Sequence, residues 1–170
     1  DWFVAGDSGA GYLNPGYLSE PRPHSDLPDG WEVWERHNHR LFEQWDLSLT
    51  GFVIDGYARG MDERGLDAYA RFSPDGVVGQ KVPKMGLHRS MPILRMDLDL
   101  YGTPAEAAEI IAARFGAGRP SFQVYRSILQ QPSWYAALDA RVTELVGDRA
   151  MAVDLYTLLY LVRAYATNPD

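Results

Sequence analysis

Short apolar segments alternate with amphipathic helical segments along most of the chain, and this alternation constrains the fold more than any other feature. The apolar segments typical of strands are residues 2–5, 49–54, 76–80, 92–100 and 121–125. Helical spacing or capping residues mark 32–45, 62–72, 103–115, 133–146 and 155–166. Strands that alternate with helices at this spacing predict an α/β fold in which a parallel sheet is covered by helices.

Two architectures are compatible with this parallel β/α alternation. A flavodoxin-like three-layer sheet of about five strands would be complete in a chain of 170 residues. A TIM-like (β/α) barrel needs about 250 residues, so only its later part would be present. The chain enters an apolar segment directly after Asp1, which favours the barrel. We therefore expect residues 1–170 to be a single domain, or the C-terminal part of a barrel-like domain truncated at its N-terminal side, with the upstream part of the same polypeptide as a partner.

Charge and residue usage exclude several classes of function. The net charge of −7 argues against nucleic acid as a partner, because phosphate backbones reward clustered Lys and Arg. The chain has no cysteine, so disulfides, thiolate zinc sites and cysteine nucleophiles are excluded. The longest apolar run, residues 155–162, is too short to span a bilayer, and no membrane span is expected.

The glycine-rich segment 6–15, Gly-Asp-Ser-Gly-Ala-Gly-Tyr-Leu-Asn-Pro, is the most informative motif. It is not typical of a phosphate-binding loop, because no helix pattern follows it directly. Trypsin-like proteases need a histidine and an aspartate earlier in the chain, and esterases of the GDSL class need a late Asp-x-x-His pair, whereas the last histidine here is His88. A tight glycine turn without chemistry remains an alternative.

Within this segment, Gly9-x-Gly11-Tyr12-x-x-Pro15 resembles the signature of the GxGYxYP family, a group inferred to be glycoside hydrolases with a barrel-like C-terminal domain. Asn14 stands where the family motif has a second tyrosine. Residues 132–133 and 152–157 are also similar to the end of such domains. The resemblance implies a carbohydrate substrate such as a polysaccharide, a secreted or periplasmic location and hydrolase activity.

Carboxylates at the carboxyl ends of the predicted strands are the candidate catalytic groups. Glycoside hydrolysis usually uses two carboxyl groups, one as acid and one as nucleophile or base, about 5 to 9 Å apart. Asp55 follows the apolar segment 49–54 and is the first candidate; Asp7 is its proposed partner. Hydrogen bonding within a turn is the alternative role of both residues. Asp97 and Asp99, which share one face of a strand, are the third choice.

Aromatic and polar side chains near the same strand ends are the candidate substrate-binding groups. They are Tyr12, Asn14, Tyr57, Gln80 and Arg126, with Trp31 and Tyr101 as further stacking candidates. We expect the Tyr12 ring to line a pocket beside Asp55, and Arg126 to bind an acidic sugar or to hold a catalytic carboxylate ionised. Burial in the core is the alternative for the aromatic rings, and a structural ion pair is the alternative for Arg126.

Neither a metal nor another cofactor is expected. His37 and His39 lie two residues apart in a helical pattern, which places them about 200° apart around the helix and separates them as ligands. His24 and His88 lie in predicted loops, where hydrogen bonding to sugar hydroxyls or plain solvation is expected. Two hypotheses of different class therefore remain: a glycoside hydrolase with paired carboxylates, and a non-catalytic carbohydrate-binding or scaffold domain of the same fold.

Overall fold

The computed structural model of the chain describes residues 3–6, 13–19, 27–55, 59–116 and 120–168. The chain forms two compact units, residues 1–96 with 155–170 and residues 97–154. Helices alternate with strands along both units. The predicted mixed α/β class with parallel strands is therefore confirmed, while the described strands form no closed barrel.

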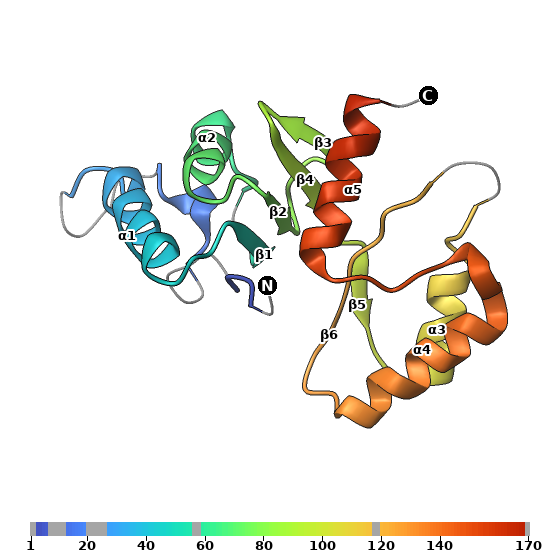
Figure 1. Ribbon diagram of the computed structural model, residues 1–170. Coiled ribbons are helices and arrows are strands. Elements are labelled where there is room, and N and C mark those ends of the chain that lie inside the picture. The colour runs from blue at the N-terminus through green and yellow to red at the C-terminus, as the bar shows by residue number, and fades with distance from the viewer. Residues whose placement is uncertain (1–2, 7–12, 20–26, 56–58, 117–119, 169–170) are drawn as a thin grey trace. The chain divides into compact units, whose positions relative to one another are not determined.

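The first unit is built on a four-stranded sheet of order β1-β2-β4-β3. Its strands are β1 (Leu49–Val53), β2 (Gly76–Gly79), β3 (Met85–His88) and β4 (Met91–Arg95). The strands β1, β2 and β4 are parallel, and β3 pairs antiparallel with β4 (Figure 1). Beyond β1, Ala5 forms a parallel bridge to Thr50. The expected direction of the segment 2–5 is thus confirmed at Ala5, although residues 3 and 4 are not in a strand.

Helices α1 (Trp31–Gln44) and α2 (Glu63–Phe72) pack together, and their buried faces meet in an aromatic cluster. Trp34, which is 3% exposed, lies at its centre, with ring centroids 5.1 Å from Tyr69 and 5.3 Å from Phe72. The cluster also contains Trp31 and Phe42, and it continues into Val77, Met91 and Ile93 of the sheet. The helices are held to the sheet by this apolar burial.

A third helix of this unit, α5 (Leu155–Thr167), packs against β3 and β4 (Figure 1). Its buried residues are Leu159 and Val162, and Leu159 lies so close to Gly76 that a Cβ there would be 2.6 Å from its Cδ1. Because helices contact the sheet through alternate strand residues on both faces, β2 and most of β4 are buried on both sides. This explains why their sequences are continuous apolar runs rather than alternating ones.

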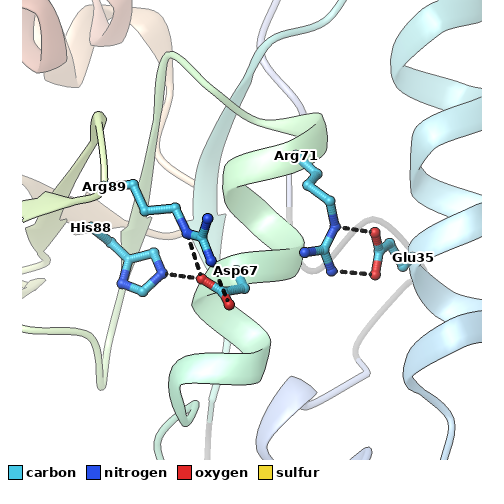
Figure 2. A network of polar contacts seen from close by, with 5 residues as sticks. All are labelled: Glu35, Asp67, Arg71, His88 and Arg89. Atoms are coloured by element: carbon cyan, nitrogen blue, oxygen red, sulfur yellow. Dashed lines mark hydrogen bonds and ion pairs between the residues drawn. The ribbon is translucent and has the colours of Figure 1, made fainter.

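Two groups of ion pairs fix α2 to its neighbours (Figure 2). On one side, Arg71 donates to both carboxylate oxygens of Glu35 on α1, with 2.6 Å between Nη2 and Oε2. On the other side, Asp67 accepts from Arg89 at 2.9 and 3.0 Å, and His88 Nε2 lies 2.6 Å from Asp67 Oδ1. His88 is the last residue of β3, and Arg89 follows it in the turn to β4 with a left-handed backbone, at φ of 56°. The charged side chains thus connect α1, α2 and the hairpin.

The Asp67 carboxylate gives the fold a predicted acid sensitivity. Hydrogen bonds from Arg89 and His88 lower the pKa of Asp67 to about 2. Its stabilising contribution is therefore present above the unfolded value of about 3.9 and is lost as the pH falls through about 2. We expect Asp67→Asn to lower the melting temperature at pH 7 and the difference from the unaltered chain to shrink toward pH 2. Thermal melts across this range, with Glu43→Gln on the exposed face of α1 as control, test this; a constant difference would contradict it.

The second unit contains a two-stranded parallel sheet and two longer helices. Its strands are β5 (Leu98–Leu100) and β6 (Tyr125–Ser127), and its helices are α3 (Pro104–Ala112) and α4 (Pro132–Val146). Thr103 caps α3 as expected, because its hydroxyl accepts from the Glu106 N–H while the Glu106 carboxylate accepts from the Thr103 N–H. Short 3₁₀ turns lie at η1 (Pro15–Tyr17) in the first unit and η2 (Gly147–Arg149) in the second.

Two further predicted strands differ from the structure, and one observed strand was not predicted. The expected strand 92–100 is divided between two sheets, because the Met96 N–H bonds to the Gly79 carbonyl whereas the Asp97 N–H bonds to the Val124 carbonyl. The strand expected at 121–125 lies at β6, at 125–127. The strand β3 was not expected, because its glycine and half-exposed residues give no buried apolar run. In the parts of the chain that the structure describes, no helix has the length and apolarity needed to cross a membrane.

Candidate functional site

The carboxyl ends of β1, β2 and β4 form one edge of the sheet of the first unit. The register aligns Val53 with Gly79 and Gly79 with Arg95, so these three strands end at the same level. Asp55 follows β1 and Gln80 follows β2 directly. The sequence prediction that these two polar residues share one sheet edge therefore agrees with the geometry, as parallel α/β folds require.

Asp55 is held at this edge by the segment after β2. Its side chain is fully buried, at 0% exposure, and its Oδ2 accepts a hydrogen bond of 2.9 Å from the Lys81 N–H. The Asp55 N–H in turn donates to Gln80 Oε1 at 3.1 Å. The other carboxyl oxygen, Oδ1, is buried and has no hydrogen-bond partner among the described residues. Such an unsatisfied buried acceptor is uncommon in native folds and calls for an explanation.

Burial raises the pKa of Asp55, and the Lys81 N–H bond and the Lys81 charge oppose this rise only partly. Desolvation acts in this direction because it penalises the ionised form of a carboxyl group more than the neutral form. Its raised pKa and its buried Oδ1 without a partner distinguish Asp55 from the other carboxyl groups of the described residues.

Two further loops reach the same edge by close backbone approach. Gly16 lies against Arg59, so that a Cβ at Gly16 would be 1.9 Å from the Arg59 carbonyl oxygen, and Arg59 Nε donates to the Gly16 carbonyl at 3.1 Å. Gly60 lies against Lys81, where a Cβ would be 2.9 Å from the Lys81 carbonyl oxygen. Glycine is required at both positions because any side chain would push the loops apart. The η1 turn and the loop before α2 are thereby connected to the residues that bind Asp55.

Asn14 is the only proposed substrate-binding residue of the glycine-rich segment within the described part of the chain. It lies at the N-cap of η1 without a capping side-chain bond, and its Oδ1 is buried with no partner among the described residues. Asp7, Tyr12 and Tyr57 lie outside the described residues. Their predicted roles as second carboxylate and as sugar-stacking rings stay predictions.

The remaining proposed residues belong to the second unit, where they form ion pairs. Arg126 lies within β6, and its guanidinium donates to Asp99 at 2.5 and 2.7 Å. This contact lowers the pKa of Asp99. Asp97 accepts from Arg114 at 3.2 Å and from the Val124 N–H at 3.0 Å. The structure thus places Arg126 in an ion pair, which was the alternative to its binding an acidic sugar, and pairs Asp97 and Asp99 each with an arginine.

Histidines and exposed aromatic residues add no further site in the described residues. His37 is exposed on α1, and His39 lies 4.0 Å from Glu35. Across the described ranges, no group of three His, Asp or Glu side chains is arranged to hold a metal ion. Trp31 is buried in the aromatic cluster, whereas Tyr101 is exposed and bonds to Asp99. His24 lies outside the described residues.

The backbone bond from Lys81 to Asp55 is the feature of the site that sequence reasoning missed. The pattern of an apolar strand followed by an aspartate identifies Asp55, but it does not identify which N–H of the neighbouring loop it accepts from. The signal available in the sequence is Gln80-Lys81 directly after the β2 segment, a polar pair at the same edge.

No protein-family model, curated protein or solved structure matches this chain significantly. The function must therefore be inferred from the site itself, together with the motif in the glycine-rich segment.

Proposed function

We propose that this chain is a carbohydrate-active domain, a glycoside hydrolase in which Asp55 is the general acid. The observation that carries the proposal is the buried Asp55 carboxyl group, whose pKa is raised and whose Oδ1 has no partner among the described residues. A glycosidic bond is cleaved when a neutral carboxylic acid protonates the leaving oxygen, and burial is a common means of keeping that acid protonated.

Asp7 is the proposed second carboxylate. Ala5 pairs in parallel with Thr50, so the chain after Ala5 runs toward the same sheet edge that holds Asp55. Two carboxyl groups about 5 to 9 Å apart across a sugar are the arrangement that glycoside hydrolases use, and the shorter separation gives retention of configuration. In this proposal Asp7 is ionised and acts as nucleophile or base on the face of the sugar opposite Asp55.

We further propose that the sheet of the first unit is an arc of a TIM-like (β/α) barrel and that the protein is secreted or periplasmic. The segment at Ala5 and the strands β1, β2 and β4 follow one another in chain order and are all parallel. A sheet without a reversal of strand order is typical of an arc of a (β/α) barrel, whereas flavodoxin-like sheets reverse order at a switch point. The antiparallel β3 is a departure from the regular barrel. The resemblance to the GxGYxYP family supports the same class and a secreted or periplasmic protein.

A non-catalytic carbohydrate-binding domain is the second candidate. It is favoured by the ion pairs of Asp97 and Asp99, which engage the third-choice carboxylates with Arg114 and Arg126. With those two acids neutralised, Asp55 is the one proposed catalytic carboxylate that the described residues place at the sheet edge. A domain that has kept the fold and lost the second acid would retain this arrangement.

Incubation of the chain with a panel of neutral and acidic polysaccharides tests the proposal. The hydrolase proposal predicts new reducing ends from at least one polysaccharide, and loss of that activity in Asp7→Asn. Binding of a polysaccharide by the chain without any new reducing ends would instead support the carbohydrate-binding domain. Absence of both hydrolysis and retention across the panel would contradict the carbohydrate class altogether.

A further inference from the structure

Cationic side chains border the Asp55 edge in a chain that is acidic overall, with 16 Lys and Arg against 23 Asp and Glu. Lys81 and Lys84 lie in the loop after β2, and Arg95 is the last residue of β4. Arg95 is tied to this loop twice: its Nε donates to the Val82 carbonyl at 2.8 Å, and its N–H donates to the Lys84 carbonyl at 2.9 Å. The guanidinium is therefore held over the loop that also holds Asp55.

Arg95 differs from most arginines of this chain in its partners. Acidic side chains pair with Arg36, Arg64, Arg71, Arg89, Arg114, Arg126, Arg141 and Arg163. Within the described residues, Arg95 has no carboxylate partner, and its side chain donates a hydrogen bond only through Nε. Lys84 likewise has no ion pair in that part of the chain, and both side chains are exposed.

We propose that Arg95 and Lys84 form a subsite for the carboxylate of a uronic acid, so that the carbohydrate bound at the Asp55 edge is an acidic glycan. This inference rests on the proposed function and specifies its substrate class. The Nε of Arg95 is already used, and the remaining planar pair of N–H donors matches the two oxygens of a carboxylate. The ammonium group of Lys84 adds a second positive charge.

Asp55 follows β1, and Arg95 is the last residue of β4. Two strand spacings, about 10 Å in all, separate β1 from β4 across β2. The anionic unit would therefore be a neighbour of the sugar whose bond Asp55 protonates. Arg126, the sequence-based candidate for this role, is instead occupied by Asp99.

Calorimetric titration tests the subsite with matched ligands. The probes are oligomers of galacturonic, glucuronic and mannuronic acid, each compared with its fully methyl-esterified form, which keeps the sugar backbone and removes the charge. We expect an acidic oligomer to bind at least tenfold more tightly than its ester. Arg95→Gln should lower the affinity for the acidic oligomer about 10- to 100-fold, and Lys84→Gln should also lower it. Arg40→Gln, an exposed arginine of α1, is the charge-matched control and should leave the affinity unchanged.

The possible outcomes separate a failure of the uronic-acid subsite from a failure of the proposed carbohydrate function. Equal binding of acid and ester, or an unchanged affinity in both Arg95→Gln and Lys84→Gln, overturns the uronic-acid subsite and leaves the carbohydrate function standing. Binding of inorganic sulfate or phosphate without any binding of uronate overturns the carboxylate assignment. Failure of all oligomers to bind overturns the subsite, and the polysaccharide panel then decides the carbohydrate function separately. Melting temperatures of the variants confirm that a lost affinity is not a lost fold.

Discussion

Replacement of Asp55 by asparagine is expected to lower glycan turnover by about 10²- to 10⁴-fold, the usual contribution of a general acid. Asparagine has nearly the same shape and keeps an oxygen that can accept from the Lys81 N–H. It has no proton to give to the leaving oxygen. The loss should therefore appear in kcat rather than in ligand affinity, because an interaction made only in the transition state is removed.

The fold of Asp55→Asn should survive this change. Because burial raises the pKa of Asp55, stability linked to this group is fully present at low pH and declines as the pH rises through the folded value. A neutral amide removes that decline, so we expect an unchanged or slightly higher melting temperature at pH 7. Asp75→Asn is the matched control, since Asp75 precedes β2 at the other end of the strand and binds Ser48. Wild-type turnover in Asp55→Asn would eliminate Asp55 as the acid.

Replacement of Trp34 by alanine is expected to have the largest effect on stability, with a loss of about 3–5 kcal/mol. Its ring is 3% exposed and touches Trp31, Tyr69 and Phe72, so truncation leaves a cavity between α1 and α2. Domains are stable by only about 5–15 kcal/mol, and the variant should therefore be close to unfolding at 37 °C.

Urea unfolding measured by fluorescence and circular dichroism tests the role of Trp34. Trp45→Ala is the control, because Trp45 follows α1 and is 66% exposed. Its removal should change the free energy of unfolding by no more than about 0.5 kcal/mol. Equal effects of the two substitutions would contradict the assignment of Trp34 to the core of the first unit.

The strongly periodic segments were predicted well from the sequence. The helices expected at 32–45 and 62–72 are found at 31–44 and 63–72, and the strand expected at 49–54 is found at 49–53. In each of these segments, the spacing of the apolar residues and the residues at the segment ends indicate the same element. Asp62, for example, accepts from the Gly65 N–H and caps α2, as an aspartate before a helical run predicts.

Elements that depend on contacts remote in sequence could not be predicted in the same way. The expected strand 92–100 looks continuous because alternation persists through Met96 and Asp97, yet the two residues bond to different sheets. The antiparallel β3 has no buried face of its own and is defined by its pairing with β4. The hydrophobic pattern of a segment does not show which strand it pairs with, because pairing depends on which segments meet in the folded chain.

The candidate site was predicted in part. The position of Asp55 after an apolar strand places it at the carboxyl edge, and the structure adds its burial and its bond from Lys81. An ion pair was one of the roles considered for Arg126, but its partner Asp99 was not predicted, because the two residues are far apart in sequence and meet only when β5 pairs with β6. The position of Arg95 at this edge was likewise not predicted, because it depends on the strand register that pairs Arg95 with Gly79.

A titration of the carboxyl carbons by NMR tests the central claim, that burial raises the pKa of the proposed acid Asp55, most directly. The Asp55 resonance is assigned as the one lost in Asp55→Asn, and Asp67, with a pKa of about 2, is an internal reference at the low end. The account predicts that Asp55 titrates above the ordinary aspartate value of about 3.9 and above Asp67. A midpoint for Asp55 at or below that ordinary value would show an ionised carboxylate and would contradict its role as the acid.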